Sequence, residues 1–350
     1  MKRLNVMKSA KLAMRRLKAV SDDKKYFQYG LIPKLSTLEK QEIHETWPFW
    51  KLTDRDMVWV RIFKKFNGFS PYAIGVWQSV MLREALNPYN QLSAFENKSM
   101  CDIYFPSISF PTPLVRRIGG IYYDIDMRVL CMEEVVRILK KEQSYIIKPA
   151  FGTMQGCGVQ KVVLGKGNDE EIVKESIKKQ PKDFIAQKVL RQHPLIESLN
   201  PTSLNCCRVT SIYINGRYDY SVMLKIGKKG SSVDNWNSSI LCGVSKDGIL
   251  ADIAYDNHLN VVRTTDNGRQ FGGMRLPKFE EMLAYVEDRH KMLFPNCGVI
   301  GWDICIDLQD QVRVIETNIT EPGLVGEQLV SGDFFRPFHD DLCAIMSKSR

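Results

Sequence analysis

Hydrophobic and polar residues follow two periods along this chain, one typical of helices and one typical of strands. Apolar residues recur at helical spacing in residues 54–65, 72–86, 132–141, 169–179 and 277–293, and residues 334–348 predict a closing helix. Val- and Ile-rich runs bounded by turn residues predict strands at 144–148, 159–164, 183–190, 208–214 and 218–226, with further strand structure across 241–252. The mixture predicts an α+β protein with a mainly helical N-terminal region.

The pattern is less regular between residues 97 and 120. A helix is expected to begin at Asn97 and to run to the proline-rich turn at residues 110–113, and residues 116–120 then lead to the next helix. The elements from residue 120 to residue 190 follow one another closely enough to form a compact α+β unit. We interpret that unit as a lid over the rest of the protein.

Two strand-like runs, residues 300–308 and 312–317, predict a β-hairpin around three polar residues. A two-residue turn in this polar break places Asp303 directly opposite Glu316, and Asn318 shares their face. Opposed carboxylates repel each other and need a cation, and oxygens of Asp, Glu and Asn suit Mg²⁺. A solvated hairpin face is the alternative, and a three-residue turn would shift the pairing by one.

A strand that ends in Lys148 continues into a loop with Gly152, Gly156 and Gly158, and a second strand follows. Such a loop can fold its backbone N–H groups over a polyphosphate while the lysine supplies a positive charge. It is not a Walker motif, because no Gly-Lys-Ser/Thr follows, and no G-x-G-x-x-G opens a helix. The loop therefore indicates phosphate binding without identifying a fold.

Composition indicates an ordinary cytoplasmic protein of several subdomains. The 350 residues are 44% hydrophobic and 25% charged. No apolar run approaches the roughly 18 residues of a membrane span, and the apolar core of a secretory signal is absent from the first residues. The nine cysteines form no C-x-x-C pair and lie mostly in apolar runs, so we expect reduced core residues.

The net charge of +9 is concentrated in the first 25 residues, where nine basic and two acidic side chains give a local balance of +7. This argues for a basic N-terminal arm and against a nucleic-acid enzyme, which would carry its basic surface on the folded body. Apolar residues of the arm approximate one helical face. Two interpretations stay open: peripheral contact of residues 1–25 with an anionic membrane surface or a partner, or packing on the protein's own domain.

Several features, in this order, resemble the ATP-grasp superfamily over about residues 97 to 320. They are Lys98, Lys148 with its glycine loop, the strand at 184–190, Arg208, Lys225, Asp303, Glu316 and Asn318. Residues 192–194, 200–205, 233–235 and 300–303 are further similar to the sugar-transfer-associated ATP-grasp family found with polysaccharide biosynthesis. The resemblance implies an α+β ATP-grasp fold in which two subdomains clamp ATP. It divides the chain into a helical region at 1–95, a lid and nucleotide-binding subdomain at 96–190, and a central subdomain with a metal site at 191–350.

The resemblance also implies a role for each of these residues. Lys98 and Lys148 would bind the nucleotide phosphates, and the loop with Gly152, Gly156 and Gly158 would close over them. The backbone of Gln187, Lys188, Val189 and Leu190 would contact the adenine. Asp303, Glu316 and Asn318 would hold Mg²⁺, while Arg208 and Lys225 would lie near the γ-phosphate and an acyl phosphate.

The function implied is an ATP-dependent carboxylate–amine ligase that forms an amide through an acyl phosphate on a carboxylated sugar or polysaccharide precursor. This chemistry needs no side-chain nucleophile, which agrees with the absence of a Ser-His-Asp or Cys-His pattern; His193, His258 and His290 are expected to be structural. The alternatives are a ligase of free amino acids or peptides and a non-catalytic nucleotide-binding scaffold. Substrate choice is expected in the loops at 227–239 and 319–327, where Glu321, Asp234 and Asn235 could contact substrate or only shape the loops.

Overall fold

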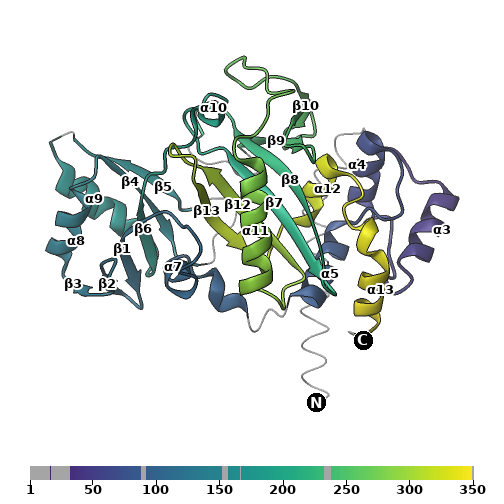
Figure 1. The fold of residues 1–350 in the computed structure, drawn as a ribbon, viewed down its shortest axis with the longest axis horizontal. Coiled ribbons are helices and arrows are strands. Elements are labelled where there is room, and N and C mark those ends of the chain that lie inside the picture. The colour runs from purple at the N-terminus through teal and green to yellow at the C-terminus, as the bar shows by residue number, and fades with distance from the viewer. Residues whose placement is uncertain are drawn as a thin grey trace.

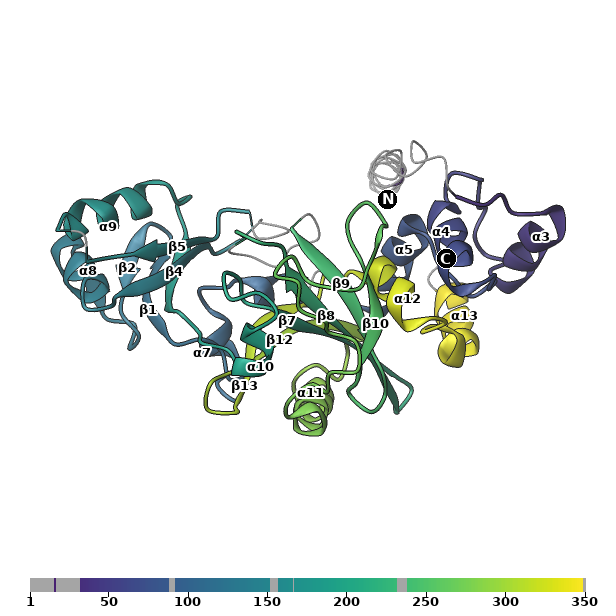
Figure 2. The same cartoon turned by 90° about the horizontal axis from the view of Figure 1, so that it is seen from above.

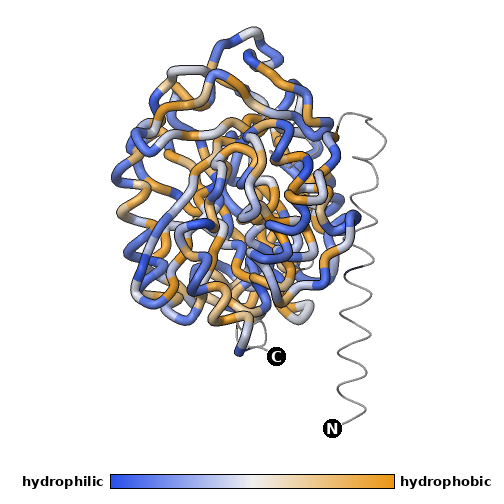
Figure 3. The backbone as a smooth tube through the Cα atoms, turned by 90° about the vertical axis from the view of Figure 1, so that its right-hand side faces the viewer, coloured by the Kyte–Doolittle hydropathy of each residue, from blue (hydrophilic) through white to orange (hydrophobic). Residues whose placement is uncertain are grey.

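The computed structural model describes Arg16 and residues 32–87, 92–151, 157–165, 167–231 and 238–348. Three parts follow one another in space (Figure 1, Figure 2): a six-stranded sheet with two helices, a central seven-stranded sheet, and a group of helices from both ends of the chain. Along the tube in Figure 3 short hydrophobic and hydrophilic stretches alternate, as expected of amphipathic elements. The prediction of an α+β protein with helices first is confirmed.

The N-terminal helices are α3 (Thr37–Thr46), α4 (Val58–Asn67) and α5 (Val76–Leu86). A capping box starts α3, because the Ser36 hydroxyl accepts from the Glu39 N–H at 3.2 Å and the Glu39 carboxylate accepts from the Ser36 N–H at 2.7 Å. From the basic arm, Arg16 is described: it donates to Asp56 and lies over the Trp77 ring, 5.6 Å from the centroid. At this residue the arm contacts its own domain.

The six-stranded sheet has the order β3-β2-β1-β6-β4-β5. Its strands are β1 (Pro113–Ile118), β2 (Ile121–Tyr123), β3 (Val129–Leu130), β4 (Ser144–Pro149), β5 (Gln160–Val163) and β6 (Phe184–Lys188). The helices α8 (Met132–Leu139) and α9 (Asp169–Lys178) pack on it around Val135, Tyr145, Val173 and Phe184, and all four of these side chains are buried. The predicted helices and strands of this part are confirmed, and the sheet begins earlier than residue 120.

The predicted helix from Asn97 to the proline-rich turn is wrong. The 3-10 turn η1 (Ser93–Glu96) precedes this segment, and within the segment only the four-residue helix α7 (Cys101–Tyr104) forms, because Pro106 disfavours helical geometry at the residue before it. The strand β1 was not predicted, since it contains two adjacent arginines, Arg116 and Arg117. Arg116 is nevertheless fully buried, and it donates two hydrogen bonds to Asp102 at 3.1 and 2.8 Å.

The seven-stranded sheet has the order β11-β10-β9-β8-β7-β12-β13. Its strands are β7 (Cys206–Ile214), β8 (Arg217–Gly227), β9 (Ser239–Val244), β10 (Leu250–Tyr255), β11 (Val261–Val262), β12 (Val299–Ile306) and β13 (Val312–Asn318). The short helix α10 (Pro194–Glu197) precedes it, and α11 (Phe279–Leu293) crosses one side of it (Figure 1). The chain closes with α12 (Leu324–Ser331), the 3-10 turn η2 (Arg336–Phe338) and α13 (His339–Lys348), so Pro337 shortens the predicted last helix.

The hairpin of β12 and β13 pairs Asp303 with Glu316, as the sequence predicts, although the predicted turn is wrong. Next to the turn Ile306 pairs with Val312, which is one position away from the register of a two-residue turn. A β-bulge then restores the register before Asp303 is reached. Two deviations therefore cancel, and the two carboxylates lie opposite each other.

The register sorts the residues of β7, β8, β12 and β13 onto two faces, because directly paired residues share a face. We call one the charged face: Cys206, Arg208, Thr210, Ser221, Lys225, Gly301, Asp303, Glu316 and Asn318. The other is the apolar face, with Cys207, Val209, Val222, Leu224, Trp302 and Ile304, and it packs on Phe279, Met282 and Val286 of α11. The N-terminal helices, α12 and α13 cover the far end of the charged face around Ile212 and Val299.

Two further expectations concern the described residues. The free cysteines include six buried ones, at positions 101, 206, 207, 242, 297 and 305, which confirms their predicted role as core residues. Trp47, Trp50, Trp59 and Trp77 are buried as well. Among the described residues, no helix has the length and apolar character needed to cross a membrane.

Candidate active site

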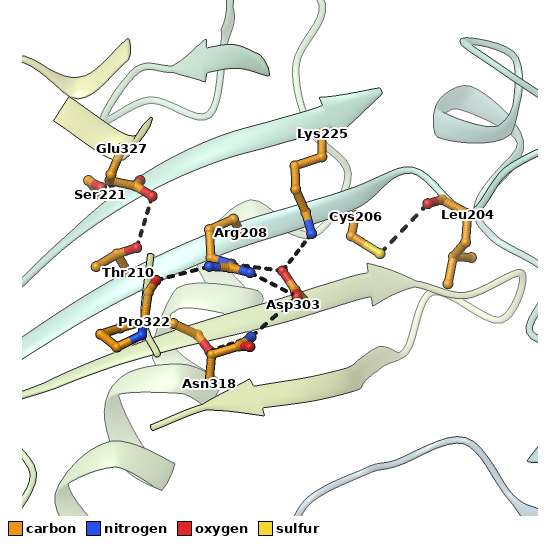
Figure 4. A network of polar contacts seen from close by, with 11 residues as sticks. Leu204, Cys206, Arg208, Thr210, Ser221, Lys225, Asp303, Asn318, Pro322 and Glu327 are labelled. Carbon is orange, nitrogen blue, oxygen red and sulfur yellow. Dashed lines mark hydrogen bonds and ion pairs between the residues drawn. The ribbon is translucent and has the colours of Figure 1, made fainter. Parts of the chain in front are cut away.

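Asp303 is the centre of a cluster on the charged face (Figure 4). Arg208 from β7 donates to both of its carboxylate oxygens, from Nε at 2.8 Å and from Nη2 at 3.0 Å, and Lys225 Nζ from β8 lies 2.9 Å away. The side chains of all three are 10–13% exposed. The sheet register brings them together, since Asp303 pairs directly with Arg208.

The electrostatics of this cluster favour full ionisation. Burial by itself raises the pKa of Asp303, but the charges of Arg208 and Lys225 outweigh it, and the pKa of Asp303 falls far below its ordinary range. Burial likewise lowers the pKa of Arg208, while Asp303 raises it further than burial lowers it. Both shifts favour the charged forms of Asp303 and Arg208, so the cluster combines one carboxylate with two basic side chains.

The second carboxylate, Glu316, has a different partner. Lys98 Nζ lies 2.9 Å from its Oε1, with side-chain exposures of 13% for Lys98 and 34% for Glu316. Lys98 comes from the segment before α7, and its backbone N–H donates to the Ala150 carbonyl at the end of β4 at 3.0 Å. The pair thus links the two sheets.

A pocket opens beside this pair, lined by Glu96, Lys98, Cys101, Asp102, Phe110, Lys148, Gln187, Ile315, Glu316 and Thr317. Lys148 is buried, and burial lowers its pKa, an effect that Glu316 opposes and Lys98 reinforces. A buried lysine next to a half-exposed carboxylate can accept an anion that relieves the desolvation of its charge. The predicted phosphate-binding lysines therefore line one cavity.

Two acidic residues of this pocket were not predicted. Glu96 binds the loop after β13, where it accepts from the Thr320 N–H at 2.7 Å, and Asp102 holds Arg116. Both partners are distant in the chain, so no local pattern indicated them. Glu96 and Lys98 together fasten one short segment to the C-terminal end of β13 and to the loop that follows it.

The predicted adenine-binding segment lies at the end of β6. Gln187 is buried, lines the pocket and donates from Nε2 to the Pro111 carbonyl at 3.1 Å, and Lys188 is exposed. Val189 and Leu190 follow the strand and are half-buried. Gly158 has φ of +79°, and a Cβ there would lie 2.7 Å from the Pro149 ring, so glycine fits this position; Gly152 and Gly156 lie outside the described residues.

Residues 200–205, which carried part of the family resemblance, support the end of β8. Asn205 Oδ1 accepts from the Gly227 N–H at 3.1 Å, and Asn200 Nδ2 donates to the Gly227 carbonyl at 2.7 Å. A Cβ on Gly227 would lie 2.0 Å from the Ser203 hydroxyl. Since Gly227 is two residues after Lys225, these side chains fix the strand that carries the lysine.

The substrate loops are described in part. In the first, Asp234 and Asn235 lie outside the described residues. In the second, Glu321 forms an ion pair with Arg83 of α5, and Pro322 accepts from Arg208 Nη1 at 2.9 Å. The second loop therefore contacts the Asp303 cluster directly.

The histidines hold structural positions. His290 is fully buried between α11 and the apolar face, with Nδ1 2.7 Å from the Ser211 hydroxyl and Nε2 2.9 Å from the Cys297 carbonyl. His193 caps α10 by accepting from the Leu195 N–H at 3.1 Å. His258 lies in a surface turn formed by Asp256, which accepts from its N–H at 2.8 Å. The charged-face cluster contains none of them.

The family model described as "Sugar-transfer associated ATP-grasp" matches residues 78–341 of the chain. None of the curated proteins compared matches it.

Among solved structures, the D-alanyl-alanine synthetase A of Vibrio cholerae O1 biovar eltor is similar at a TM-score of 0.43 and 11% identity, covering 72% of this chain and 64% of that one. The ATP-grasp ligase PsnB, solved with a minimal precursor, has a TM-score of 0.40 and 14% identity, with coverages of 73% and 62%. D-cycloserine synthetase DcsG gives 0.40 and 14%, with coverages of 76% and 71%. The chain thus spans less than two thirds of the length of the first two.

Proposed function

The chain belongs to the sugar-transfer associated ATP-grasp family, and on that premise we propose that it is an ATP-dependent ligase that joins a carboxylate to an amine through an acyl phosphate. We propose further that the carboxylate is carried by a sugar or a polysaccharide precursor. The family description supports the sugar, and the chemistry of the site supports the ligase. The division at residues 95 and 190 is part of this proposal, with the nucleotide held between the two sheets.

One observation carries the proposal: four cationic side chains from separate parts of the chain gather around two opposed carboxylates. Arg208 and Lys225 lie at Asp303, and Lys98 and Lys148 line the pocket at Glu316. A polyphosphate brings several negative charges, and each unit pair at about 4 Å is worth roughly 4 kcal/mol at an effective dielectric near 20. Such a group of cations suits a nucleotide whose terminal phosphate is transferred.

In the proposed reaction, an oxygen of the carboxylate substrate attacks the γ-phosphorus and ADP leaves, which produces an acyl phosphate. The amine then attacks the acyl carbon, and phosphate leaves as the amide forms. Among the described contacts, three of the five N–H groups of Arg208 bind Asp303 and Pro322, so two remain for a phosphoryl oxygen. Asp303 orients this guanidinium, and Lys225 places a second cation beside it.

The donors at the hairpin fit a hard divalent cation. Asp303, Glu316 and Asn318 share the charged face, and Asn318 Nδ2 lies 3.3 Å from Asp303 Oδ2. Side-chain cations already lie next to both carboxylates. The site therefore attracts the kind of charge that a metal ion carries. Oxygen ligands of this kind are those that Mg²⁺ prefers, and the bound ion would neutralise charge on the nucleotide phosphates. The described residues contain no group of three His, Cys, Asp or Glu side chains in metal-binding range, so Asn318 and the nucleotide itself would complete the ligand set.

The test is ADP release from Mg·ATP in the presence of paired acids and amines, with uronic acids and amino acids as the two acid panels. We expect release only when an acid and an amine are both present, and we expect sugar acids to be the effective acids. Release with pairs of amino acids alone would identify a ligase of free amino acids. ATP binding without release in any pair, together with partner binding that is salt-sensitive and lost on deletion of residues 1–25, would identify a nucleotide-dependent scaffold.

A further inference from the structure

The helix α12 packs on the charged face, where its Glu327 lies beside Thr210 and Ser221 (Figure 4). It approaches the sheet closely, since a Cβ on Gly243 would lie 2.8 Å from the Val330 carbonyl. Glu327 of this helix is fully buried and accepts hydrogen bonds from two strands: one from Thr210 at 2.9 Å and one from Ser221. A carboxyl group that no described part of the proposed reaction uses therefore lies next to the site.

The two hydroxyls that bind Glu327 are direct cross-strand partners, and Thr210 follows Arg208 by two residues on the same face of β7. No ion pair in the described part of the chain includes Glu327, because Arg208 is engaged with Asp303 and Pro322. Burial raises the pKa of Glu327, which favours the neutral acid and removes the need for a counter-ion. Glu327 thus fastens the helix to the sheet through the two hydroxyls, and Arg208 keeps its contacts with Asp303 and Pro322.

The loop that precedes α12 lies directly against Arg208. Its Pro322 carbonyl accepts from Arg208 Nη1 at 2.9 Å, and a Cβ on Gly323 would lie 3.0 Å from that same nitrogen. A Cβ on Gly301, beneath the loop, would lie 2.7 Å from the Pro322 carbonyl oxygen. The loop thus has almost no room to move toward the sheet, and the position of α12 decides whether it can move away.

We propose that Glu327 is a positioning residue for Arg208: it anchors α12 to Thr210 and Ser221, and thereby holds the Pro322 carbonyl where it orients the guanidinium together with Asp303. The inference rests on the proposed function in so far as it gives Arg208 a role at the transferred phosphoryl group. Its structural part, the anchoring of residues 319–323, stands independently of the reaction.

Gln328 provides a matched control. It is the next residue of α12, it is equally buried, and it fastens the other side of the helix, where its side chain bonds the N–H and the carbonyl of Ile74 at 2.8 and 2.6 Å. Its contacts lead to the N-terminal region and not to the sheet. Loss of Gln328 should therefore weaken only the contact of α12 with the N-terminal region, while Glu327 keeps its hydrogen bonds to Thr210 and Ser221 and α12 stays in place on the charged face.

The experiment compares Glu327→Ala, Glu327→Gln and Gln328→Ala in the full chain. In Glu327→Ala we expect faster hydrogen exchange in residues 319–324 and a kcat lower by about 100-fold, with the KM for ATP changed less than about two-fold, because a displacement on the order of 1 Å can cost that much in rate. Glu327→Gln, which keeps the shape and can keep both hydrogen bonds, should restore both readouts. Gln328→Ala should lower the melting temperature but keep kcat within about three-fold of the original.

An equal loss of kcat in Gln328→Ala and Glu327→Ala would overturn the proposal, as would unchanged exchange in residues 319–324 of Glu327→Ala. If Glu327→Ala fails to fold, Thr210→Val and Ser221→Ala remove one hydrogen bond each and should change the two readouts in the same direction. A chain that releases no ADP with any acid–amine pair would refute the proposed function alone. The exchange measurements would then still decide whether Glu327 anchors the loop.

Discussion

The two faces of the seven-stranded sheet are built by alternate residues of the same strands, but one buries apolar side chains and the other buries charged ones. On the apolar face Val209, Leu224 and Trp302 are buried against α11, and stability comes from packing. On the charged face Arg208, Lys225 and Asp303 are nearly as buried, and the Asp303 carboxylate is paired with Arg208 on the next strand, β7, and with Lys225 on the strand beyond it, β8. Trp302 and Asp303 are consecutive residues of β12, and they lie on the apolar face and on the charged face respectively.

This difference teaches why the proposed active site can be both dry and charged. Ions held in a sheet by direct cross-strand partners need little side-chain movement to stay paired, so their desolvation is offset within the scaffold. Glu316 lies at the edge of the same face, and its partner Lys98 comes from the segment that leads to the other sheet. Its side chain remains a third exposed. We expect the inner cluster to contribute to stability and chemistry, and the outer pair to contribute mainly to chemistry.

The largest effect should follow Asp303→Asn. Removal of the charge leaves Arg208 and Lys225 without their common partner, so we expect a loss of about 3–5 kcal/mol in the free energy of unfolding. We also expect ADP release to fall by about 1,000-fold or more, because the guanidinium loses its orientation at the transferred phosphoryl group. Chemical denaturation and ADP release measure the two effects. Undiminished turnover would refute the role of Asp303 in the site.

Glu316→Gln should separate the two contributions. We expect turnover to fall by about 100-fold, since a proposed metal ligand is lost, while the unfolding free energy changes by less than about 1 kcal/mol because the ion pair is partly exposed. The Mg²⁺ concentration needed for half-maximal ADP release should rise. If Glu316→Gln is destabilised as much as Asp303→Asn, the distinction between the inner cluster and the outer pair is wrong.

Trp302→Phe tests the opposite face. The variant loses the hydrogen bond from Trp302 Nε1 to the Ser211 hydroxyl, 2.9 Å long, and leaves a small void in a fully buried position. We expect a loss of about 1–3 kcal/mol in stability and turnover within about two-fold of the original chain. A drop in turnover comparable to that of Glu316→Gln would mean that the faces are not functionally separable.

The sequence predicted what depends on local periods. Alternation along β12 and β13 placed Asp303 opposite Glu316, and the order of lysines, glycines and acids carried the family resemblance. Most helices and strands with regular apolar spacing are present within a few residues of the expected bounds. Even the correct pairing depended on chance in part, because a bulge compensated for an unforeseen turn register.

What the sequence could not predict depends on partners distant in the chain. From the sequence alone, Arg116 is expected at the surface. In the fold it is buried and paired with Asp102, so β1 was missed. Glu96 binds Thr320 across 224 positions, and Glu327 binds Thr210 across 117. In each case a polar side chain is buried because tertiary structure supplies a hydrogen-bond partner, and no local pattern carries that information.

The prediction with no expected effect at neutral pH concerns His290, a histidine that is buried against the apolar face. Burial lowers the pKa of His290 to about 4, although the Cys297 carbonyl partly opposes the shift, whereas an unfolded histidine titrates near about 6.5. Between these values the unfolded chain binds the proton more tightly than the folded one. Stability should therefore fall as the pH is lowered from about 6.5 to about 4, by at most about 1.4 kcal/mol per pH unit from this group.

His290→Gln is the variant that isolates this effect, because it can keep hydrogen bonds to Ser211 and Cys297 without taking up a proton. Denaturation curves at several pH values should show a shallower acid dependence in the variant, with turnover near pH 7 unchanged. Equal slopes in the two proteins would show that His290 is not the group that makes the apolar face sensitive to acid. On the charged face the side chains stay ionised because they form ion pairs. On the apolar face the buried histidine is stable only in its neutral form.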